Sequence, residues 1–349
     1  MKKPNVLILY TGGTFGMNVQ KGSTQNALLL GIPLLSAAQL RKRLHDQVPE
    51  LQHIAHCHVE ILLNRDSAHI GPEEWLLIAR KIQTNWKKYS GVVLLHGTDT
   101  LTYTASALSF LLRPCLKPVI ITGAQRPLSA LRTDARTNLI SAVEIAANGP
   151  RLVVNQVTVV FGSQLFQGNR IRKKSAVDFA AFESPHFPPL AVIGTTIRYS
   201  NQPLMISRYP HLVPIFDKKV MIVHITPGFP AEILAKSFLN DLHGFILVAF
   251  HSGTAPTHSQ NFLEFLRLAK RRQIPVIIVT EGSTQPPSSK KIKIRYAAGN
   301  DLISEGCFGA GAMTPECAFI KTSLLLGQTK KLSEFSKLWT QNLAGEDNN

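Results

Sequence analysis

The chain has 349 residues, of which 44% are hydrophobic and 17% charged, and its formal net charge is +16. This length predicts one larger and one smaller domain, and no apolar run approaches the roughly 20 residues that a membrane-spanning helix needs. The apolar run after the N-terminal lysines is also shorter than the roughly 7–15 residues of a signal peptide, so we expect a cytoplasmic protein without a membrane partner.

The basic residues form short clusters along the chain rather than one basic tail. Lys and Arg number 38 against 22 Asp and Glu, and the clusters lie at 41–43, 170–174, 270–272 and 290–295. None of the clusters is interleaved with aromatic residues or accompanied by a recognised nucleic-acid motif. Such a charge affects solubility and encounter rate rather than fold, so a nucleic-acid partner is disfavoured.

The four cysteines are far apart in the chain and form no Cys-x-x-Cys pair. Their scatter argues against a disulfide framework and against a zinc site, and it predicts reduced thiols. Cys57 lies between His56 and His58, but without a second cluster of ligands these residues are too few to indicate a metal site. The four residues are Cys57, Cys115, Cys307 and Cys317.

In chain order, short apolar and β-branched runs alternate with segments of helical periodicity. Each run ends in a turn that contains Gly or Thr, as expected for strands that alternate with helices. This pattern predicts a mostly parallel sheet with helices on both faces. The predicted strands are 6–10, 92–95, 119–122 and 157–161, and the predicted helices between them are 72–89 and 101–112.

A proline-rich, irregular stretch at 183–216 follows, and strand–turn–helix units resume after it. We therefore predict an α/β protein with a large N-terminal domain and a smaller C-terminal α/β domain. The later predicted elements are strands 220–225, 245–250 and 276–280 and a helix at 261–271. The predicted bounds are 1–200 for the first domain, 201–217 for a linker and 218–349 for the second domain, and the tip at 345–349 is expected to fray.

Ligands of such folds bind at the carboxyl ends of the strands, which places residues 11–14, 96–100 and 123–126 along one edge of the sheet. The first of these stretches reads Thr-Gly-Gly-Thr. Its glycines lack the Gly-x-Gly-x-x-Gly spacing of a dinucleotide site, and the dipeptide Gly-Lys of a Walker loop occurs nowhere in the chain. Phosphate binding is therefore disfavoured, which leaves a structural turn or a turn that presents a hydroxyl group.

The second stretch, His-Gly-Thr-Asp-Thr at 96–100, also follows a predicted strand and opens a predicted helix. Asp99 or Thr100 alone could simply cap that helix. Two strand ends on one edge nevertheless each carry a threonine, and Thr98 stands beside a carboxylate. Because a hydroxyl group is a poor nucleophile without a base within hydrogen-bond reach, a carboxylate–lysine pair would be needed to activate it.

With these two stretches the sequence resembles the L-asparaginases, specifically their cytoplasmic bacterial type I branch. Both signatures of that family, TGGT at 11–14 and HGTDT at 96–100, occur in the right order and at the right spacing. The resemblance spans essentially the whole chain. Further matching stretches are 103–110, 117–119, 122–125, 168–170, 181–185, 297–300 and 341–343.

The resemblance implies hydrolysis of the side-chain amide of asparagine to aspartate and ammonia, without a metal or a cofactor. Thr14 matches the nucleophilic threonine of the family. Thr98 matches its second threonine, which forms a proton-handling triad with Asp99 and a lysine. The family lysine lies three residues beyond an Asn-Arg pair, which gives Lys173 here, with Lys174 as its neighbour.

The resemblance also implies which residues bind the amino-acid substrate. Ser67, in the pair Asp66-Ser67, matches the residue that holds the α-carboxylate. Asp99, beside Thr98, matches the partner of the substrate ammonium, and the backbone carbonyl of Ala124 matches a position that faces the leaving amide. Relatives assemble as homodimers or homotetramers, which would bring residues of 281–300 in one chain to the Thr14 of another.

The chain departs from the family in the loop after TGGT, where relatives carry a tyrosine that hydrogen-bonds the nucleophile. No tyrosine occurs between Tyr10 and Tyr89, and the loop at 21–26 offers Ser23 or Thr24 instead. Three interpretations stay open: another hydroxyl group substitutes, a tyrosine from elsewhere reaches in, or the protein is a weak or degenerate enzyme.

A second departure precedes the lysine, where Ile171 and Arg172 stand in place of two threonines common in relatives. We expect Arg172 to add positive charge beside Lys173 and so to favour its neutral amine. The loop at 280–285 lacks the cysteine seen in some type I members, which argues against their allosteric asparagine site.

Two alternative functions stay open beside the hydrolase. The first is an ammonia-producing subunit of a tRNA-dependent amidotransferase, which suits the basic charge, although such subunits carry an added N-terminal domain and TGGT here begins at residue 11. The second is an amino-acid-binding protein that keeps the pocket and has lost catalysis.

Overall fold

The computed structural model describes residues 3–17, 36–149, 151–200, 212–235, 240–280 and 302–347, without the side chain of residue 152. Contacts between residues divide the chain into two compact units, Met1–Ile206 and Ser207–Asn349. Residues 201–211 of the expected linker lie outside the described residues, so the bounds 1–200, 201–217 and 218–349 stay predictions. Within the described ranges, no helix is both long and apolar enough to cross a membrane.

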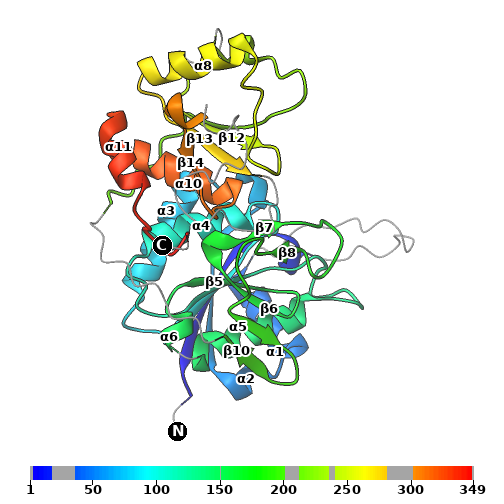
Figure 1. Cartoon of the computed structure of the whole chain (residues 1–349). Coiled ribbons are helices and arrows are strands. Elements are labelled where there is room, and N and C mark those ends of the chain that lie inside the picture. Colours follow the sequence, from blue (N-terminus) through cyan, green and yellow to red (C-terminus); the bar gives the residue numbers. More distant parts are fainter. Residues whose placement is uncertain are drawn as a thin grey trace. The chain divides into compact units, whose positions relative to one another are not determined.

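An eight-stranded, mostly parallel sheet forms the centre of the first unit (Figure 1). Its strands are β1 (Asn5–Gly12), β2 (His56–Arg65), β3 (Gly91–Leu95), β4 (Val119–Thr122), β5 (Val157–Phe161), β6 (Gln164–Gln167), β9 (Ala191–Ile193) and β10 (Ile197–Tyr199). Their order across the sheet is β10-β9-β6-β5-β4-β3-β1-β2. From β2 to β5 the neighbouring strands are parallel, whereas β6, β9 and β10 are antiparallel to their neighbours. The carboxyl ends of β1, β3 and β4 therefore lie along one edge.

Helices cover both faces of this sheet, because strands of a parallel sheet are apolar on both sides. The α-helices are α1 (Ala37–Gln47), α2 (Leu51–Ile54), α3 (Pro72–Thr84), α4 (Leu101–Leu111), α5 (Ala135–Asn148) and α6 (Arg151–Val154). Short 3-10 helices are η1 (Thr14–Gly16), η2 (Ser67–His69) and η3 (Gly168–Arg170), and a separate two-stranded sheet joins β7 (Arg172–Lys173) to β8 (Phe182–Glu183).

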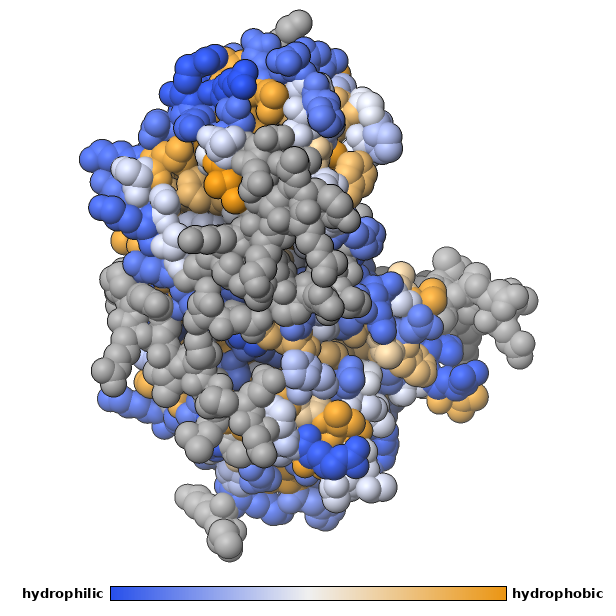
Figure 2. Space-filling model, in the orientation of Figure 1, coloured by the Kyte–Doolittle hydropathy of each residue, from blue (hydrophilic) through white to orange (hydrophobic). Residues whose placement is uncertain are grey.

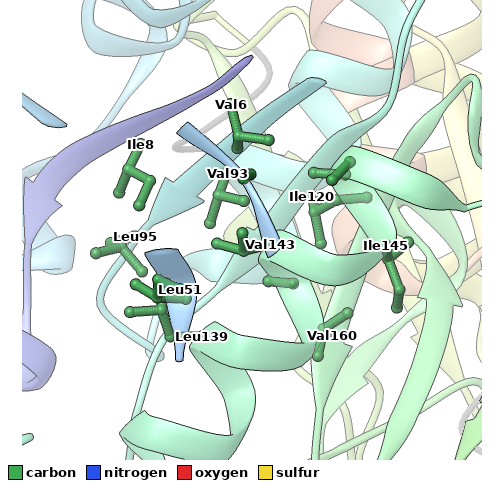
Figure 3. Close-up of a cluster of buried hydrophobic side chains, with 14 of the residues drawn as sticks. Val6, Ile8, Leu51, Val93, Leu95, Ile120, Leu139, Val143, Ile145 and Val160 are labelled. Atoms are coloured by element: carbon green, nitrogen blue, oxygen red, sulfur yellow. The ribbon is translucent and has the colours of Figure 1, made fainter. Parts of the chain in front are cut away.

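Successive side chains of β1 face opposite sides of the sheet, so the strand packs against the helices of both layers. Val6 and Ile8 pack with side chains of α1, α2 and α5, and Figure 3 shows this cluster around Val93 and Ile120. Leu7 and Leu9 belong to a second cluster, which includes side chains of α3 and α4. The strand is almost completely buried, so its position relative to the helices is set from both sides.

Local sequence signals explain where α3 begins and ends. Pro72 occupies its first position, and the carboxylate of Glu74 accepts a hydrogen bond of 3.0 Å from the N–H of Gly71. The helix buries Trp75 and other apolar side chains on one face. It ends five residues before the predicted end at 89, where the side chain of Asn85 donates to the carbonyl of Lys81 at 2.8 Å.

The second unit contains a parallel four-stranded sheet in the order β11-β12-β13-β14. These strands are β11 (Val220–His224), β12 (Gly244–Ala249), β13 (Val276–Thr280) and β14 (Phe308–Gly309), and the helices are α7 (Ala231–Ile233), α8 (Gln260–Arg271), α10 (Pro315–Leu326) and α11 (Leu332–Trp339). The Ser259 hydroxyl caps α8, which buries Phe262 and Phe265 and leaves a largely hydrophilic outer surface (Figure 2).

The predicted fold class is confirmed, because a large mostly parallel sheet is followed by a smaller α/β unit. The apolar runs at 92–95, 119–122 and 157–161 are strands to within one residue. Strand β2 was not predicted from the sequence, because its residues alternate less clearly between apolar and polar. Cys57 and its flanking histidines lie on this edge strand, and no group of three or more metal-binding side chains comes together among the described residues.

The prediction of a frayed C-terminal tip is wrong for residues 345–347, which are buried. The ammonium of Lys321 in α10 donates to a carboxylate oxygen of Glu346 at 2.6 Å, and both side chains are at most 1% exposed. The same carboxylate accepts the N–H groups of Leu343 at 2.9 Å and Ala344 at 2.6 Å. This buried ion pair connects the tail to α10 of the second unit. The polar residues of the terminus gave no sign that the tail would be buried, because the partner lysine is distant in the chain.

Candidate active site

Glycines allow the loop after β1 to pass directly against its neighbours. Gly12 has φ +122° and Gly13 has φ +84°, conformations that other residues rarely adopt. A Cβ atom on Gly13 would lie 2.5 Å from the Cα of Gly97, and one on Gly12 would lie 1.9 Å from the carbonyl oxygen of Arg65. The TGGT turn therefore touches the end of β2 and the loop after β3, and Thr14 follows directly after this contact.

The loop after β2 brings Ser67 to the same place. The side chain of Asp66 accepts a hydrogen bond of 2.9 Å from the N–H of Ala68 and so caps η2. Ser67 is only 3% exposed, and a Cβ atom on Gly97 would lie 2.8 Å from its Oγ. The Thr100 hydroxyl donates to the Ser67 carbonyl at 2.6 Å, which ties this loop to the start of α4.

Lys173 on β7 contacts both members of the pair Thr98-Asp99. Its Nζ donates to Oγ1 of Thr98 at 2.8 Å and to Oδ1 of Asp99 at 2.7 Å. The Lys173 side chain is 18% exposed, whereas that of Asp99 is 70% exposed. The structure thus assembles the three residues of the predicted triad, with the carboxylate open to a charged ligand.

The capping interpretation of Asp99 and Thr100 is not what the structure shows. The N-cap of α4 is Thr100, but no side-chain hydrogen bond caps the helix. The hydroxyl of Thr100 is used on Ser67 and the carboxylate of Asp99 on Lys173. These polar side chains serve contacts between loops rather than the helix end.

The expected charge effect of Arg172 does not follow from the geometry. Successive side chains of a strand point to opposite faces, so Arg172 and Lys173 diverge. Arg172 lies opposite Glu183 in the β7–β8 ladder, and Ile171 is completely buried. The charged group in direct contact with the ammonium of Lys173 is the carboxylate of Asp99.

A buried chain of hydrogen bonds supports the loop that carries Thr98. The indole N–H of Trp75 donates to Oγ1 of Thr104 at 3.0 Å, and Thr104 lies 3.0 Å from Nε2 of His96. Nδ1 of His96 lies 2.7 Å from the Gly97 carbonyl, which can only accept, so this nitrogen carries the proton. Complete burial lowers the pKa of His96 to about 4, against a smaller opposing effect of that hydrogen bond, so the ring is neutral near pH 7.

The turn after β4 carries Ala124 and Gln125 to the same edge. Ala124 is 1% exposed, and Oε1 of Gln125 accepts a hydrogen bond of 3.4 Å from the Thr98 hydroxyl. The carboxylate of Asp134 accepts the N–H of Gln125 at 3.0 Å, and Nδ2 of Asn138 donates to the Gly123 carbonyl at 3.1 Å. The first turn of α5 therefore positions this loop.

Tyr10 supports the TGGT turn from within the core. Its phenol donates to the carbonyl of Gly13 at 3.4 Å, and burial raises its pKa to about 12. The two residues proposed to replace the family tyrosine, Ser23 and Thr24, lie outside the described residues, as does 281–300. What replaces the missing phenol stays a prediction.

The site contains residues that sequence reasoning did not single out. His96 and Gln125 belong to stretches that match the family, but the sequence suggested no role for either side chain, and it did not point to Asp134. Their roles depend on partners 8, 27 and 9 residues away in the chain. The one local signal was the polar sequence Thr133-Asp134 before a helical segment, which is typical of a helix start.

Fold and site together define a class: a two-unit α/β protein with a hydroxyl, lysine and carboxylate in contact at the carboxyl edge of a parallel sheet. Residues 5–205 match the family described as Asparaginase, N-terminal, and residues 219–339 match the Glutaminase/Asparaginase C-terminal domain. The chain therefore belongs to the asparaginase family.

Individual relatives agree with this assignment. The chain is 37% identical to L-asparaginase 1 of Escherichia coli (strain K12), over 99% of this chain and 98% of that protein. The crystal structure of L-asparaginase I from Vibrio cholerae O1 has a TM-score of 0.83 and 33% identity, covering 99% of this chain and all of that one. A component of the glutamyl-tRNA(Gln) amidotransferase of Methanobrevibacter smithii is 30% identical, over 99% of this chain and 77% of that protein.

Proposed function

We propose that the chain hydrolyses the side-chain amide of L-asparagine to L-aspartate and ammonia, with Thr14 as the nucleophile. The observation that carries this proposal is the contact of Lys173 with Thr98 and Asp99 at 2.8 and 2.7 Å, on a loop that touches the TGGT turn. Membership of the asparaginase family and 37% identity to an L-asparaginase support the same activity.

In the proposed reaction the oxygen of Thr14 attacks the amide carbon, and the C–N bond then breaks. The Thr14 proton passes to the leaving nitrogen, so ammonia departs and an ester on Thr14 remains. A water molecule attacks that ester, aspartate leaves and the threonine regains its proton. Thr98 and Lys173 would exchange the protons, since the amine can accept one through the hydroxyl group that it touches.

Substrate binding in the proposal uses the surrounding loops. Ser67 would hold the α-carboxylate, with Asp66 fixing its short helix through the N–H of Ala68. Asp99, 70% exposed on its side chain, would pair with the substrate ammonium, and the carbonyl of Ala124 would face the leaving amide. Backbone N–H groups of the glycine-rich turn would donate to the oxygen that gains negative charge.

The two alternatives predict different measurements. An amidotransferase component would need tRNA, and the 30% identity to such a component is lower than the 37% identity to an L-asparaginase. A gel shift with tRNA at physiological salt would test that interpretation, because nonspecific attraction to a basic surface weakens as salt rises. An amino-acid-binding homologue would bind asparagine and release no ammonia.

The test is ammonia release from asparagine and, separately, from glutamine. Thr14→Ala and Thr98→Ala should each abolish most of the release, while Thr84→Ala, which removes an exposed hydroxyl at the end of α3, should leave it unchanged. Binding of asparagine without any release by the wild-type protein would refute the hydrolase. Equal release by Thr14→Ala and the wild type would refute the nucleophile.

We include a homo-oligomeric assembly and a cytoplasmic location in the proposal. Their support is the resemblance to type I relatives, carried by the stretches 11–14 and 96–100. Light scattering would give the mass of the assembly, to be compared with 38.5 kDa for one chain.

A further inference from the structure

Gln125 connects Thr98 with the loop that follows Lys173. Its Oε1 accepts a hydrogen bond of 3.4 Å from the Thr98 hydroxyl, and its Nε2 donates to the carbonyls of Ser175 at 3.4 Å and Asp178 at 3.2 Å. Both carbonyls can only accept, so the amide must direct its nitrogen toward them and its oxygen toward Thr98. The neighbouring backbone therefore fixes which atom of Gln125 meets the hydroxyl.

The same hydroxyl has Lys173 as its second partner. Nζ of Lys173 lies 2.8 Å from Oγ1 of Thr98 and 2.7 Å from Oδ1 of Asp99. An ammonium group only donates, so while Lys173 is charged the hydroxyl proton of Thr98 must point elsewhere, and Oε1 of Gln125 receives it. At 3.4 Å this bond is longer than a usual O–H···O bond, which makes it the contact that breaks when the hydroxyl turns.

We propose that Gln125 is a positioning residue that holds the Thr98 proton away from Lys173 and thereby stabilises the ammonium form. Lys173, Thr98 and Gln125 then form one directed chain of hydrogen bonds, each donating to the next. Lys173 has to lose a proton before it accepts one from Thr98, and the contact of Thr98 with Gln125 opposes that loss. The catalytic consequence rests on the proposed function, whereas the hydrogen-bond chain does not.

The backbone of Gln125 is rigid enough for such a role. Its N–H and that of Arg126 both donate to the carboxylate of Asp134, at distances of 3.0 to 3.1 Å. Asn138 donates to the same carboxylate at 3.2 Å and to the Gly123 carbonyl at 3.1 Å. Asp134 is 5% and Asn138 4% exposed, so the turn is anchored to α5 by buried groups.

Among the described residues, few charged groups surround the chain of hydrogen bonds. Asp99, from the loop after β3, is in direct contact with Lys173. Asp134 lies on the backbone side of Gln125, where its oxygens accept N–H groups, and Asp178 accepts from Gln125 through its carbonyl. Arg172 and Lys174 flank Lys173 in the chain, and Arg172 lies opposite Glu183 in the β7–β8 ladder. Replacing Gln125 therefore changes the acceptor and leaves these charges in place.

Two replacements of Gln125 should shift the pH profile of kcat/KM for asparagine in opposite directions. Gln125→Met keeps the length of the side chain and removes the acceptor, so the acidic limb should move to lower pH by about 0.4 to 1 unit, the equivalent of one ordinary hydrogen bond. Gln125→Glu supplies an anionic acceptor and should move the same limb to higher pH. The matched control is Gln83→Met on the exposed side of α3, which should leave the profile unchanged.

A second measurement needs no turnover. Competitive acetylation of lysines with acetic anhydride, read by mass spectrometry across a pH series, follows how Lys173 becomes reactive, and Lys174 serves as an internal reference. The reactivity curve of Lys173 should shift down in Gln125→Met and up in Gln125→Glu. If wild-type protein released no ammonia while these curves shifted, the proposed function would fail and the role of Gln125 would stand.

The role of Gln125 is overturned by coinciding acetylation curves of Lys173 in the wild type and both variants, even in an active enzyme. It is also overturned if both variants lose activity equally at every pH, since that result describes a structural residue. Circular dichroism of each variant identifies a failure to fold. If only one variant folds, the direction in which its Lys173 acetylation curve shifts decides whether the role of Gln125 stands.

Discussion

Replacement of Glu346 by glutamine tests whether the C-terminal tail is held by a buried charge. Glu346 is fully buried and accepts hydrogen bonds from the ammonium of Lys321 at 2.6 Å and from two backbone N–H groups. In Glu346→Gln the ammonium stays buried without a counter-charge, and its partners are neutral: the carbonyls of Trp339 at 3.0 Å and Gln341 at 2.8 Å and the amide oxygen of the substituted side chain. Removing one partner of a buried ion pair costs about 3–5 kcal/mol of unfolding free energy.

This change should lower the melting temperature of the second unit by roughly 10 °C, given that 1 kcal/mol corresponds to roughly 2–4 °C in a domain of this size. Trp339 is the single tryptophan of residues 207–349 and lies 5.0 Å from the ammonium of Lys321, so its fluorescence reports the local transition. Urea unfolding followed at this tryptophan gives the free energy directly.

A matched control and a double variant separate the buried pair from a general effect of charge. Glu334→Gln removes an exposed carboxylate that pairs with Lys331 at 3.3 Å, and it should produce no measurable change. In Glu346→Gln combined with Lys321→Met, the loss should be smaller than the sum of the two single losses, because no unpaired charge stays buried. Equal effects of Glu346→Gln and Glu334→Gln would refute the reasoning.

The same pair predicts how stability depends on acid. Burial alone would raise the pKa of Glu346, but the Lys321 ammonium and the N–H groups of Ala344 and Leu343 hold it below its ordinary value of 4.5. A carboxyl group whose folded-state pKa is lowered contributes stability above its unfolded value and loses that contribution as the pH falls through the folded value. Glu346→Gln should therefore flatten the acid side of the stability curve below pH 4.5.

Three further predictions concern the site. Lys173→Met should lower asparagine turnover by about 10²–10⁴-fold, whereas its neighbour variant Lys174→Met should keep it; a loss confined to Lys174→Met would show that the wrong lysine was assigned. Gly13→Ala should lower activity by at least about 10²-fold, because a Cβ atom at φ +84° would lie 2.5 Å from the Cα of Gly97, while Gly194→Ala, with its nearest neighbour 3.9 Å away, should have no effect. Burial lowers the pKa of His96 to about 4 from 6.5, so the unfolded state binds more protons than the folded state between these two pH values. The free energy of unfolding should therefore fall by about 3 kcal/mol as the pH drops across that window. Urea midpoints measured against pH should show this slope in the wild type and lack it in His96→Gln.

Local patterns were enough to predict much of the fold. The run 119–122 is β-branched at every residue and apolar at its first three, as suits a strand that is buried on both faces. This local pattern predicts a strand without any knowledge of its partners. Pro72 and the periodic apolar residues after it likewise predicted the start of α3. The end of that helix was missed by five residues, since the side-chain contact of Asn85 with the Lys81 carbonyl carries no periodic signal.

The site was predictable only as far as motifs reach. TGGT and HGTDT located Thr14, Thr98 and Asp99, and spacing chose Lys173 over Lys174. In the structure it is Lys173 that contacts Thr98, which lies 75 positions away in the chain. Apart from the family spacing to the Asn-Arg pair at 169–170, no local pattern states which lysine faces the loop after β3.

The sequence by itself determined the alternation of strands and helices and the glycines that let two turns touch, because these follow from the chemistry of neighbouring residues. Only the tertiary structure decided that Gln125 meets the Thr98 hydroxyl, that Asp134 holds that turn, and that Glu346 is buried against Lys321. Each of these contacts joins residues from separate elements, and their energies depend on burial, which arises only when the whole sheet and its helices have packed.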